Sequence, residues 1–238
     1  MFPTMSSSAA SSPEPVRAAA RRLVAALAPG RALDVPSGTA LFSAELRSLG
    51  WEVTCADRDP IPARASGFDT LAIDMEAPLP LPTDSFDLVV CLEGIEHIEG
   101  QAALVTEFAR ILAPGGHLVL STPNVLGRPS RRSLARAAYA RFFRPLPLGA
   151  PTPFENEHLH PIDVVRLDFL LRGAGLVPES WDGDAGPAGE RASLRHRILG
   201  RLEAPGVRRN NPRADLVLHP AVLHSRVLAV RAKKVVAG

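Results

Sequence analysis

The chain has 238 residues, of which 46% are hydrophobic, and its formal net charge is +2. This length and composition favour one soluble α/β domain and argue against two domains of ordinary size, because a single large core needs most of the chain. No run of 18 apolar residues is present, and residues 1–15, rich in Ser, Ala and Pro, lack the apolar stretch of a secretory signal. We therefore expect a cytoplasmic protein with a disordered N-terminus over residues 1–15 and a single domain over 16–238.

Helical and strand patterns alternate through the chain. Helical spacing of apolar residues predicts helices at 16–27, 39–49 and 101–112, and from about 161 to 173 or 175. Short apolar runs predict strands at 31–35, 51–56, 68–73, 86–92, 117–121 and 176–181, and alternation over 222–230 predicts a last, antiparallel strand. With right-handed crossovers, this order gives an α/β fold with a doubly wound, seven-stranded, mostly parallel sheet. Its ligands would bind beyond the carboxyl ends of the strands.

Two basic insertions interrupt this pattern, at about residues 125–160 and 183–220. Residues 128–144 hold six arginines and no acid, and their apolar residues fall in the i, i+4 rows of a basic amphipathic helix. Such a helix could be a lid over the substrate, an anchor on an anionic membrane surface, a dimer interface or a core-packed helix with solvated arginines. Nucleic acid is a poor fit as a partner, because only 5% of the residues are aromatic and few could stack on bases.

A tight turn follows the first predicted strand, and an aspartate follows each of the first three. Gly38 lies in the turn, where a Cβ would obstruct the close approach of a nucleotide-like ligand to the backbone. Asp34, Asp57 and Asp74 would line one rim of the sheet. Carboxylates suit a cationic, amine-bearing nucleoside such as S-adenosylmethionine better than a pyrophosphate.

The turn departs from the glycine pattern of dinucleotide-binding proteins. Pro36 and Ala40 stand where the first and third glycines of that pattern would fall, so an NAD(P)-dependent oxidoreductase is a weaker alternative. A single aspartate at a strand end is often only a turn former or a helix cap, but three in register favour ligand binding.

Several segments carry a resemblance to a known family. The segments Leu33–Thr39, Ala56–Pro60, Ile73–Glu76, Phe86–Val89 and Leu112–Leu118 resemble the ordered motifs of class I S-adenosylmethionine-dependent methyltransferases, over about residues 20–180. The resemblance implies a Rossmann-like methyltransferase fold. It implies that Asp34 and Gly38 border the methionine moiety, that Asp57 binds the ribose hydroxyls, and that Asp74 with Met75 flanks the adenine. The full set of expected cofactor-binding residues is Asp34, Pro36, Gly38, Asp57, Arg58, Asp74, Met75 and Leu92.

A second group of polar residues follows the fourth strand. If Glu93, Glu96 and His97 turn helically, they share one face, and with His158 or His160 they could form a mixed N/O site for Mg²⁺, Mn²⁺ or Zn²⁺. Two other readings stay open: His97 as a general base beside Glu96, or a purely structural role.

The same residues resemble a more specific group of enzymes. The Glu-x-x-Glu-His spacing is similar to that of ubiquinone-pathway O-methyltransferases and small-RNA 2′-O-methyltransferases, as is Ser121–Asn124. By that resemblance, a metal would bind the acceptor oxygens and lower the pKa of a hydroxyl.

These observations favour an S-adenosylmethionine-dependent O-methyltransferase that acts on a hydroxylated small-molecule or lipid-linked acceptor. In that reading His97 and Glu96 are the catalytic residues. A degenerate methyltransferase-like binding module without catalysis is the first alternative, because Pro36 and Ala40 replace glycines. An RNA 2′-O-methyltransferase is the second. We expect a cytoplasmic location, with peripheral membrane association through residues 128–144 as the alternative.

Overall fold

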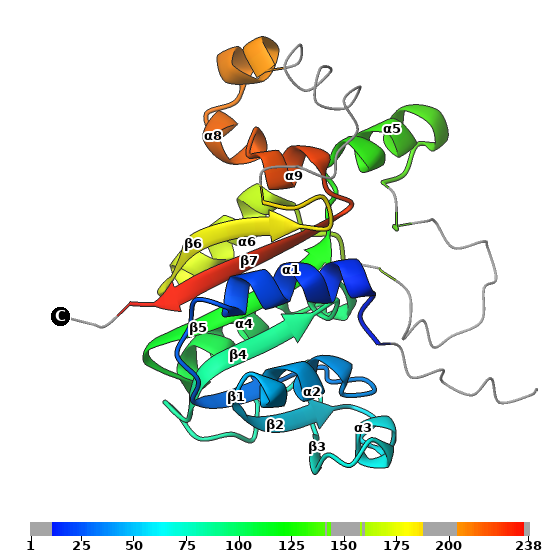
Figure 1. Cartoon of the computed structure of the whole chain (residues 1–238). Coiled ribbons are helices and arrows are strands. Elements are labelled where there is room, and N and C mark those ends of the chain that lie inside the picture. The colour runs from blue at the N-terminus through cyan, green and yellow to red at the C-terminus, as the bar shows by residue number, and fades with distance from the viewer. Residues whose placement is uncertain (1–10, 141, 144–157, 159, 188–203, 236–238) are drawn as a thin grey trace, which may run out of the picture.

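A sheet of seven strands in the order β3-β2-β1-β4-β5-β7-β6 forms the centre of the molecule (Figure 1). The computed structural model describes residues 11–140, 142–143, 158, 160–187 and 204–235. Strand β7 is antiparallel to both of its neighbours, and the other strand pairs are parallel. The strands are β1 (Arg31–Asp34), β2 (Glu52–Asp57), β3 (Thr70–Ala72), β4 (Phe86–Leu92), β5 (Leu112–Pro123), β6 (Leu176–Gly183) and β7 (Val227–Lys234). The predicted fold class is therefore confirmed.

Helices cover both faces of the sheet. In Figure 1, α1 and α2 lie in front of the sheet and α4 and α6 behind it. The bounds of the helices around the sheet are α1 (Glu14–Val24), α2 (Leu41–Ser48), α3 (Ile61–Ala65), the 3₁₀ turn η1 (Ile95–His97), α4 (Gln101–Ile111) and α6 (Val164–Gly173). Helix α1 begins at Glu14, so residues 14 and 15 are helical, whereas residues 1–10 of the predicted disordered segment lie outside the described residues.

The central strand β4 explains the nearly continuous apolar run in the sequence. Leu88, Val90 and Leu92 belong to the core cluster that includes α1, whereas Val89 and Cys91 belong to the cluster on the opposite face. Because both faces of this strand are covered by helices, both sets of side chains must be apolar. The carboxyl end of β4 thus lies at the middle of the sheet, next to that of β1.

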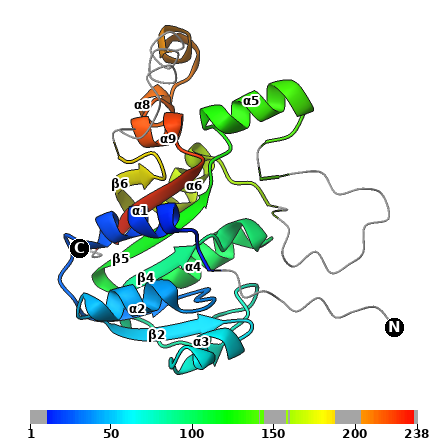
Figure 2. The same ribbon diagram turned by 45° about the vertical axis from the view of Figure 1, so that its right-hand side comes forward.

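A separate lobe lies beyond the carboxyl end of β5 (Figures 1 and 2). It consists of α5 (Arg128–Ala137), the helical residues 204–210, α8 (Ala214–Val217) and α9 (Pro220–His224). Leu216 and Val222 of the lobe are buried in one small cluster with Val164 of α6 and Leu228 of β7. The lobe is therefore attached to the body through its own apolar contacts.

The last strand lies later in the sequence than its alternating pattern predicts. Residues 222–224 of the predicted strand are in α9, and β7 begins only at Val227. Pro220 stands in the first turn of α9, and the Nδ1 atom of His219 accepts a hydrogen bond from the N–H of Ala221. These two features start a helix, so the prediction for 222–226 was wrong.

The basic helix of the first insertion is shorter than predicted. Helix α5 ends at Ala137, and Ala138 has a left-handed backbone with φ of 60°. Leu134 is 47% exposed, and Ser130 is the buried residue of α5, so the core-packed alternative was wrong. Residues 141 and 144–157 of this insertion, and 188–203 of the second, lie outside the described residues. Within the described ranges, no helix combines the length and the hydropathy that a membrane crossing requires.

Candidate active site

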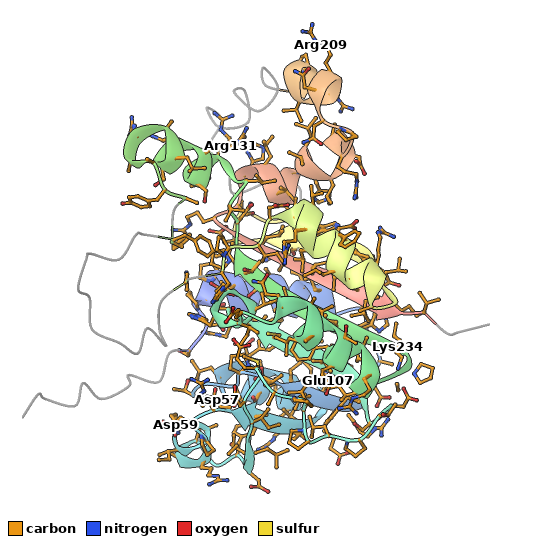
Figure 3. The ribbon with its side chains drawn as sticks, turned by 180° about the vertical axis from the view of Figure 1, so that it is seen from behind. Asp57, Asp59, Glu107, Arg131, Arg209 and Lys234 are labelled. Atoms are coloured by element: carbon orange, nitrogen blue, oxygen red, sulfur yellow. The ribbon has the colours of Figure 1, made fainter. Side chains whose placement is uncertain are left out.

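The turn after β1 is joined to the end of β2 by a hydrogen bond. Gly38 and Ala40 both have left-handed backbones, with φ of 51° and 60°. The N–H of Gly38 donates to the Oδ2 atom of Asp57 at 2.8 Å, and the N–H of Asp59 donates to Oδ1 at 3.1 Å. The turn therefore places a carboxylate and a glycine backbone side by side, as the sequence predicts. Figure 3 shows Asp57 and Asp59 near α3.

The aspartate at the end of β1 is buried below this turn. Asp34 is 2% exposed, and its Oδ2 atom accepts a hydrogen bond from the hydroxyl of Ser43 at 2.5 Å. The pKa of Asp34 is raised from 3.8 to about 7, chiefly by burial and to a smaller extent by the charge of Asp57, against the lowering effect of the Ser43 hydrogen bonds. A cation placed beside Asp34 would favour its ionised form.

A small, solvent-open cavity lies at this end of the sheet. Its lining residues are Ser11, Ser12, Arg17, Asp34, Pro36, Ser37, Leu41, Phe42 and Leu92. Arg17 of α1 reaches the cavity while its Nε atom donates to Glu45 of α2 at 3.0 Å and its Nη1 atom donates to the carbonyl of Ser12. Arg17 cannot be distinguished in the sequence from the other surface arginines of an amphipathic helix, so it was not predicted as a site residue.

The third aspartate of the predicted rim lies at the end of β3. The Nη2 atom of Arg58 is 3.5 Å from the Oδ1 atom of Asp74, and both side chains are exposed. Met75 is partly buried against the core. Strands β3, β2 and β1 are neighbours in the sheet. Asp74, Asp57 and Asp34 therefore lie along the carboxyl ends of these strands, and we call them the acidic rim.

Glu93 follows β4 but lies outside the helical turn that the sequence predicts. Its backbone is left-handed, with φ of 53°, and precedes the 3₁₀ turn. The hydroxyl of Ser121 on β5 donates to the Oε1 atom of Glu93 at 2.9 Å and accepts from its N–H at 3.0 Å. The prediction that residues 93–97 are helical was therefore wrong at Glu93. The sequence could not show this, because it carries no local signal for a left-handed backbone at a glutamate.

The loop after β4 contacts the turn after β1 at Gly94. A Cβ on Gly94 would lie 2.6 Å from the Cδ atom of Pro36 and 3.1 Å from the Sγ atom of Cys91. Such contacts are closer than a methyl group allows, so the absence of a side chain at Gly94 lets the two loops touch. The acidic rim and the residues after β4 consequently share one end of the sheet.

Glu96, His97 and His158 come together beside this loop, and we call them the Glu96 cluster. One ligand atom from each lies within 4.8 Å of the others, and the two imidazole ring centroids are 4.9 Å apart. The Nε2 atom of His158 is 3.9 Å from the Oε1 atom of Glu96. Of the predicted metal ligands, Glu93 and His160 lie outside this group, although the N–H of His160 donates to the carbonyl of Glu96 at 3.1 Å.

The carboxyl group of Glu96 has an unusual environment. It is fully buried, and neither of its oxygens has a well-formed hydrogen bond among the described residues. Burial raises the pKa of Glu96 well above its ordinary value and the charge of Glu93 raises it further, whereas the Glu96 backbone N–H and the Thr122 hydroxyl lower it. A buried carboxylate with so few donors is costly unless a proton or a cation compensates its charge. One carboxylate and two imidazoles form a mixed O/N donor set that fits a divalent cation.

The strand order, the antiparallel β7 and the acidic rim define a Rossmann-like methyltransferase fold. The sequence profile of the methyltransferase domain family matches residues 13–180. A ubiquinone biosynthesis O-methyltransferase of Xanthomonas oryzae pv. oryzae is 36% identical over 166 residues, which cover 66% of this chain and 66% of that relative. The chain belongs to the methyltransferase domain family, and the resemblance to S-adenosylmethionine-dependent methyltransferases is confirmed.

Solved structures agree on the fold. An S-adenosylmethionine-dependent methyltransferase of Archaeoglobus fulgidus superposes with a TM-score of 0.60 at 17% identity, covering 92% of this chain and 93% of that one. The Burkholderia thailandensis 1,6-didemethyltoxoflavin-N1-methyltransferase, with S-adenosylhomocysteine bound, gives a TM-score of 0.57 at 15% identity, covering 94% and 79%. The family membership supports the prediction of S-adenosylmethionine as the cofactor.

Proposed function

We propose that this protein transfers the methyl group of S-adenosylmethionine to a hydroxyl oxygen of a small-molecule or lipid-linked acceptor. The observation that carries the proposal is the contact between the turn of Pro36 and the loop of Gly94, which brings the acidic rim beside the Glu96 cluster. One side of this end of the sheet would then hold the cofactor, and the other would hold the acceptor.

On the cofactor side, each polar group of S-adenosylmethionine would meet a protein group of complementary charge. The rim carboxylate Asp34 would face the cationic amino acid end of the cofactor, and Asp57 would accept hydrogen bonds from the ribose hydroxyls. The guanidinium of Arg17 at the same cavity would pair with the cofactor's carboxylate. Asp74, Arg58 and Met75 would border the adenine, while Pro36, Gly38 and Leu92 would supply backbone and apolar contact.

On the acceptor side, the reaction needs a nucleophilic oxygen aimed at the methyl carbon. The acceptor oxygen forms the new bond to that carbon as the carbon–sulfur bond breaks, and the sulfonium leaves as a neutral thioether. The hydroxyl proton would pass to an imidazole nitrogen of His97, acting as a general base within the Glu96 cluster. In the alternative in which Glu96, His97 and His158 would hold a Mg²⁺, Mn²⁺ or Zn²⁺, the cation would take the place of the His97 base by lowering the pKa of the acceptor hydroxyl.

Aromatic residues beside the cluster favour an aromatic acceptor. The ring centroids of Phe142 and Phe143 lie 6.4 and 5.7 Å from that of His158, and Phe142 is 39% exposed. Stacking on such rings would orient a hydroxylated aromatic compound. The name of the Xanthomonas relative, a ubiquinone biosynthesis enzyme, supports the same acceptor class.

An anionic membrane surface is the partner we propose for the basic residues at 128–144. Leu134 is exposed on α5, and Arg132 and Arg136, two residues before and two after it in the sequence, are exposed as well. An apolar side chain among arginines is the composition of an interfacial helix. Cosedimentation of the full chain with phosphatidylglycerol vesicles, but not with phosphatidylcholine vesicles, is expected, and Leu134→Asp should reduce it; equal sedimentation with both would contradict the assignment.

A methyl-transfer screen tests the proposed activity. The full chain is incubated with methyl-labelled S-adenosylmethionine and a panel of catechols and hydroxylated quinone precursors, and the products are identified by mass spectrometry. His97→Ala should lower turnover by about 100-fold, the effect of losing a general base. Loss of activity on chelation, restored by Mg²⁺, Mn²⁺ or Zn²⁺, would support the cation. Cofactor binding without turnover of any acceptor would instead favour the non-catalytic binding module.

A further inference from the structure

We infer that Gln101 is a positioning residue that holds His158 against Glu96. Gln101 is the first residue of α4 and is 4% exposed. Its Nε2 atom donates to the carbonyl of Ile95 at 3.2 Å and to the carbonyl of His160 at 2.8 Å. One side chain therefore joins the 3₁₀ turn that carries Glu96 to the segment that carries His158. The inference rests on the proposed function, because the cluster it positions is the one assigned to acceptor activation.

A backbone hydrogen bond completes the link between the two segments. The N–H of His160 donates to the carbonyl of Glu96 at 3.1 Å. Together with the two hydrogen bonds of Gln101, it fixes the separation of the two backbones. His158 lies two residues before His160, so the contact of His160 with Glu96 limits how far the His158 imidazole can lie from Glu96.

The chemistry of the amide explains why glutamine suits this position. A glutamine amide has two N–H donors, the number that the two carbonyls require. Glutamate has the same shape, but when ionised it has only acceptors, so it would repel both carbonyls. Within the described residues, Gln101 makes no hydrogen bond to the side chains of Glu96, His97 or His158. Its effect on the cluster is therefore indirect, through the backbones that carry them.

An external link matters here because the direct contact between Glu96 and His158 is long. The Nε2 atom of His158 is 3.9 Å from the Oε1 atom of Glu96, which is farther than a hydrogen bond. Without the Gln101 link, burial of the carboxyl group would favour separation of the two segments or entry of water. The link keeps the donor set assembled for a cation or an acceptor.

The test compares Gln101→Leu and Gln101→Glu with the wild-type full chain. Thr70→Val is the matched control, because Thr70 is buried, its hydroxyl donates to the carbonyl of Phe68 at 3.1 Å, and it lies on the edge strand β3. The first readout is the proton NOE between the His97 and His158 rings in histidine-labelled protein. The second is the visible absorption of added Co²⁺, and the third is the affinity for S-adenosylhomocysteine.

The two Gln101 variants should weaken or lose the ring NOE and bind Co²⁺ about 10- to 100-fold more weakly, as loss of a residue supporting the ligands does. Their affinity for S-adenosylhomocysteine should stay at the wild-type level, and Thr70→Val should leave all three readouts unchanged. An unchanged NOE and Co²⁺ affinity in the folded Gln101 variants would overturn the inference. If Gln101→Leu does not fold, the same comparison is made with Gln101→Glu, which keeps the side-chain shape.

The same measurements separate the inference from the proposed function. A wild-type chain that binds no S-adenosylhomocysteine contradicts the proposed function, whereas the NOE still decides the role of Gln101. If the wild-type chain binds no Co²⁺, the cation is dropped from the proposed function and the rest of the proposal is unaffected.

Discussion

The acidic rim and the Glu96 cluster lie at one end of the sheet, but the chain builds them differently. The rim is local: Gly38 and Asp57, which share a hydrogen bond, are 19 residues apart and follow adjacent strands. The cluster is held by a long-range link, since Gln101 and His160 are 59 residues apart. The strand order alone brings the rim together, whereas the cluster also depends on side-chain contacts between distant segments.

The largest effect should come from the rim. Asp57→Asn should weaken binding of S-adenosylmethionine by about 100-fold, because the uncharged amide accepts fewer and weaker hydrogen bonds from the Gly38 turn and from the ribose. Equilibrium dialysis with labelled cofactor measures the change. Asp69→Asn, at an exposed acid before β3, is the control and should bind like wild type. Equal affinities of the two variants would show that the rim does not bind the cofactor.

The pH dependence of stability probes the same rim without ligand. Asp34 has a pKa raised to about 7 by burial, so the folded state binds a proton more tightly than the unfolded chain. Its contribution to stability is therefore present below pH 4 and is lost as the pH rises towards 7. We expect the free energy of unfolding to fall by about 2 to 3 kcal/mol over this range.

Urea titrations at several pH values measure that fall. Glu93 and Glu96, whose pKa values are also raised, act in the same direction, so Asp34→Asn should remove only part of it. If the free energy of unfolding of Asp34→Asn falls with pH as steeply as that of the wild type, Asp34 does not titrate in this range.

The contact between α6 and the lobe predicts a loss of stability when Asp168 is replaced. This buried carboxylate of α6 accepts from Arg172 at 3.1 Å and from Arg213, next to α8, at 3.0 Å. Asp168→Ala should destabilise the fold by about 2 kcal/mol, as loss of hydrogen bonds to a charged group does, and increase proteolysis of the lobe. Asp215→Ala is the control, because Asp215 is 76% exposed and 3.8 Å from Arg213. Similar urea midpoints for the two variants would contradict the anchoring role of Asp168.

The smallest effect should follow from replacing Ala40 in the turn by glycine. Ala40 has a left-handed backbone and is 1% exposed. Ala40→Gly relieves a strain of about 1 kcal/mol but loses a buried methyl worth about 0.8 kcal/mol, so stability should change by less than about 0.5 kcal/mol. Thermal denaturation checks this, and Ala40→Val, with a branched side chain in the same conformation, should instead melt much earlier. If Ala40→Val melts like wild type, the turn is not as constrained as we describe.

The sequence predicts the rim well because its signals are local. Apolar runs end at Asp34 and at Asp57, and Gly38 lies between them. The alternation of strands and helices is enough to bring these three residues together. The cluster is harder to predict, since no local pattern chooses between His158 and His160. The left-handed backbone of Glu93 depends on Ser121, which follows it by 28 residues. Arg17 was missed for a related reason, because only packing of α1 against α2 brings it to the cavity.

Isothermal titration of the full chain with S-adenosylhomocysteine decides whether the acidic rim binds the cofactor. We expect saturable binding of one ligand per chain, strongly weakened by Asp57→Asn and unaffected by Gln101→Leu. A wild-type chain that gives no heat of binding and no competition with labelled S-adenosylmethionine would contradict it.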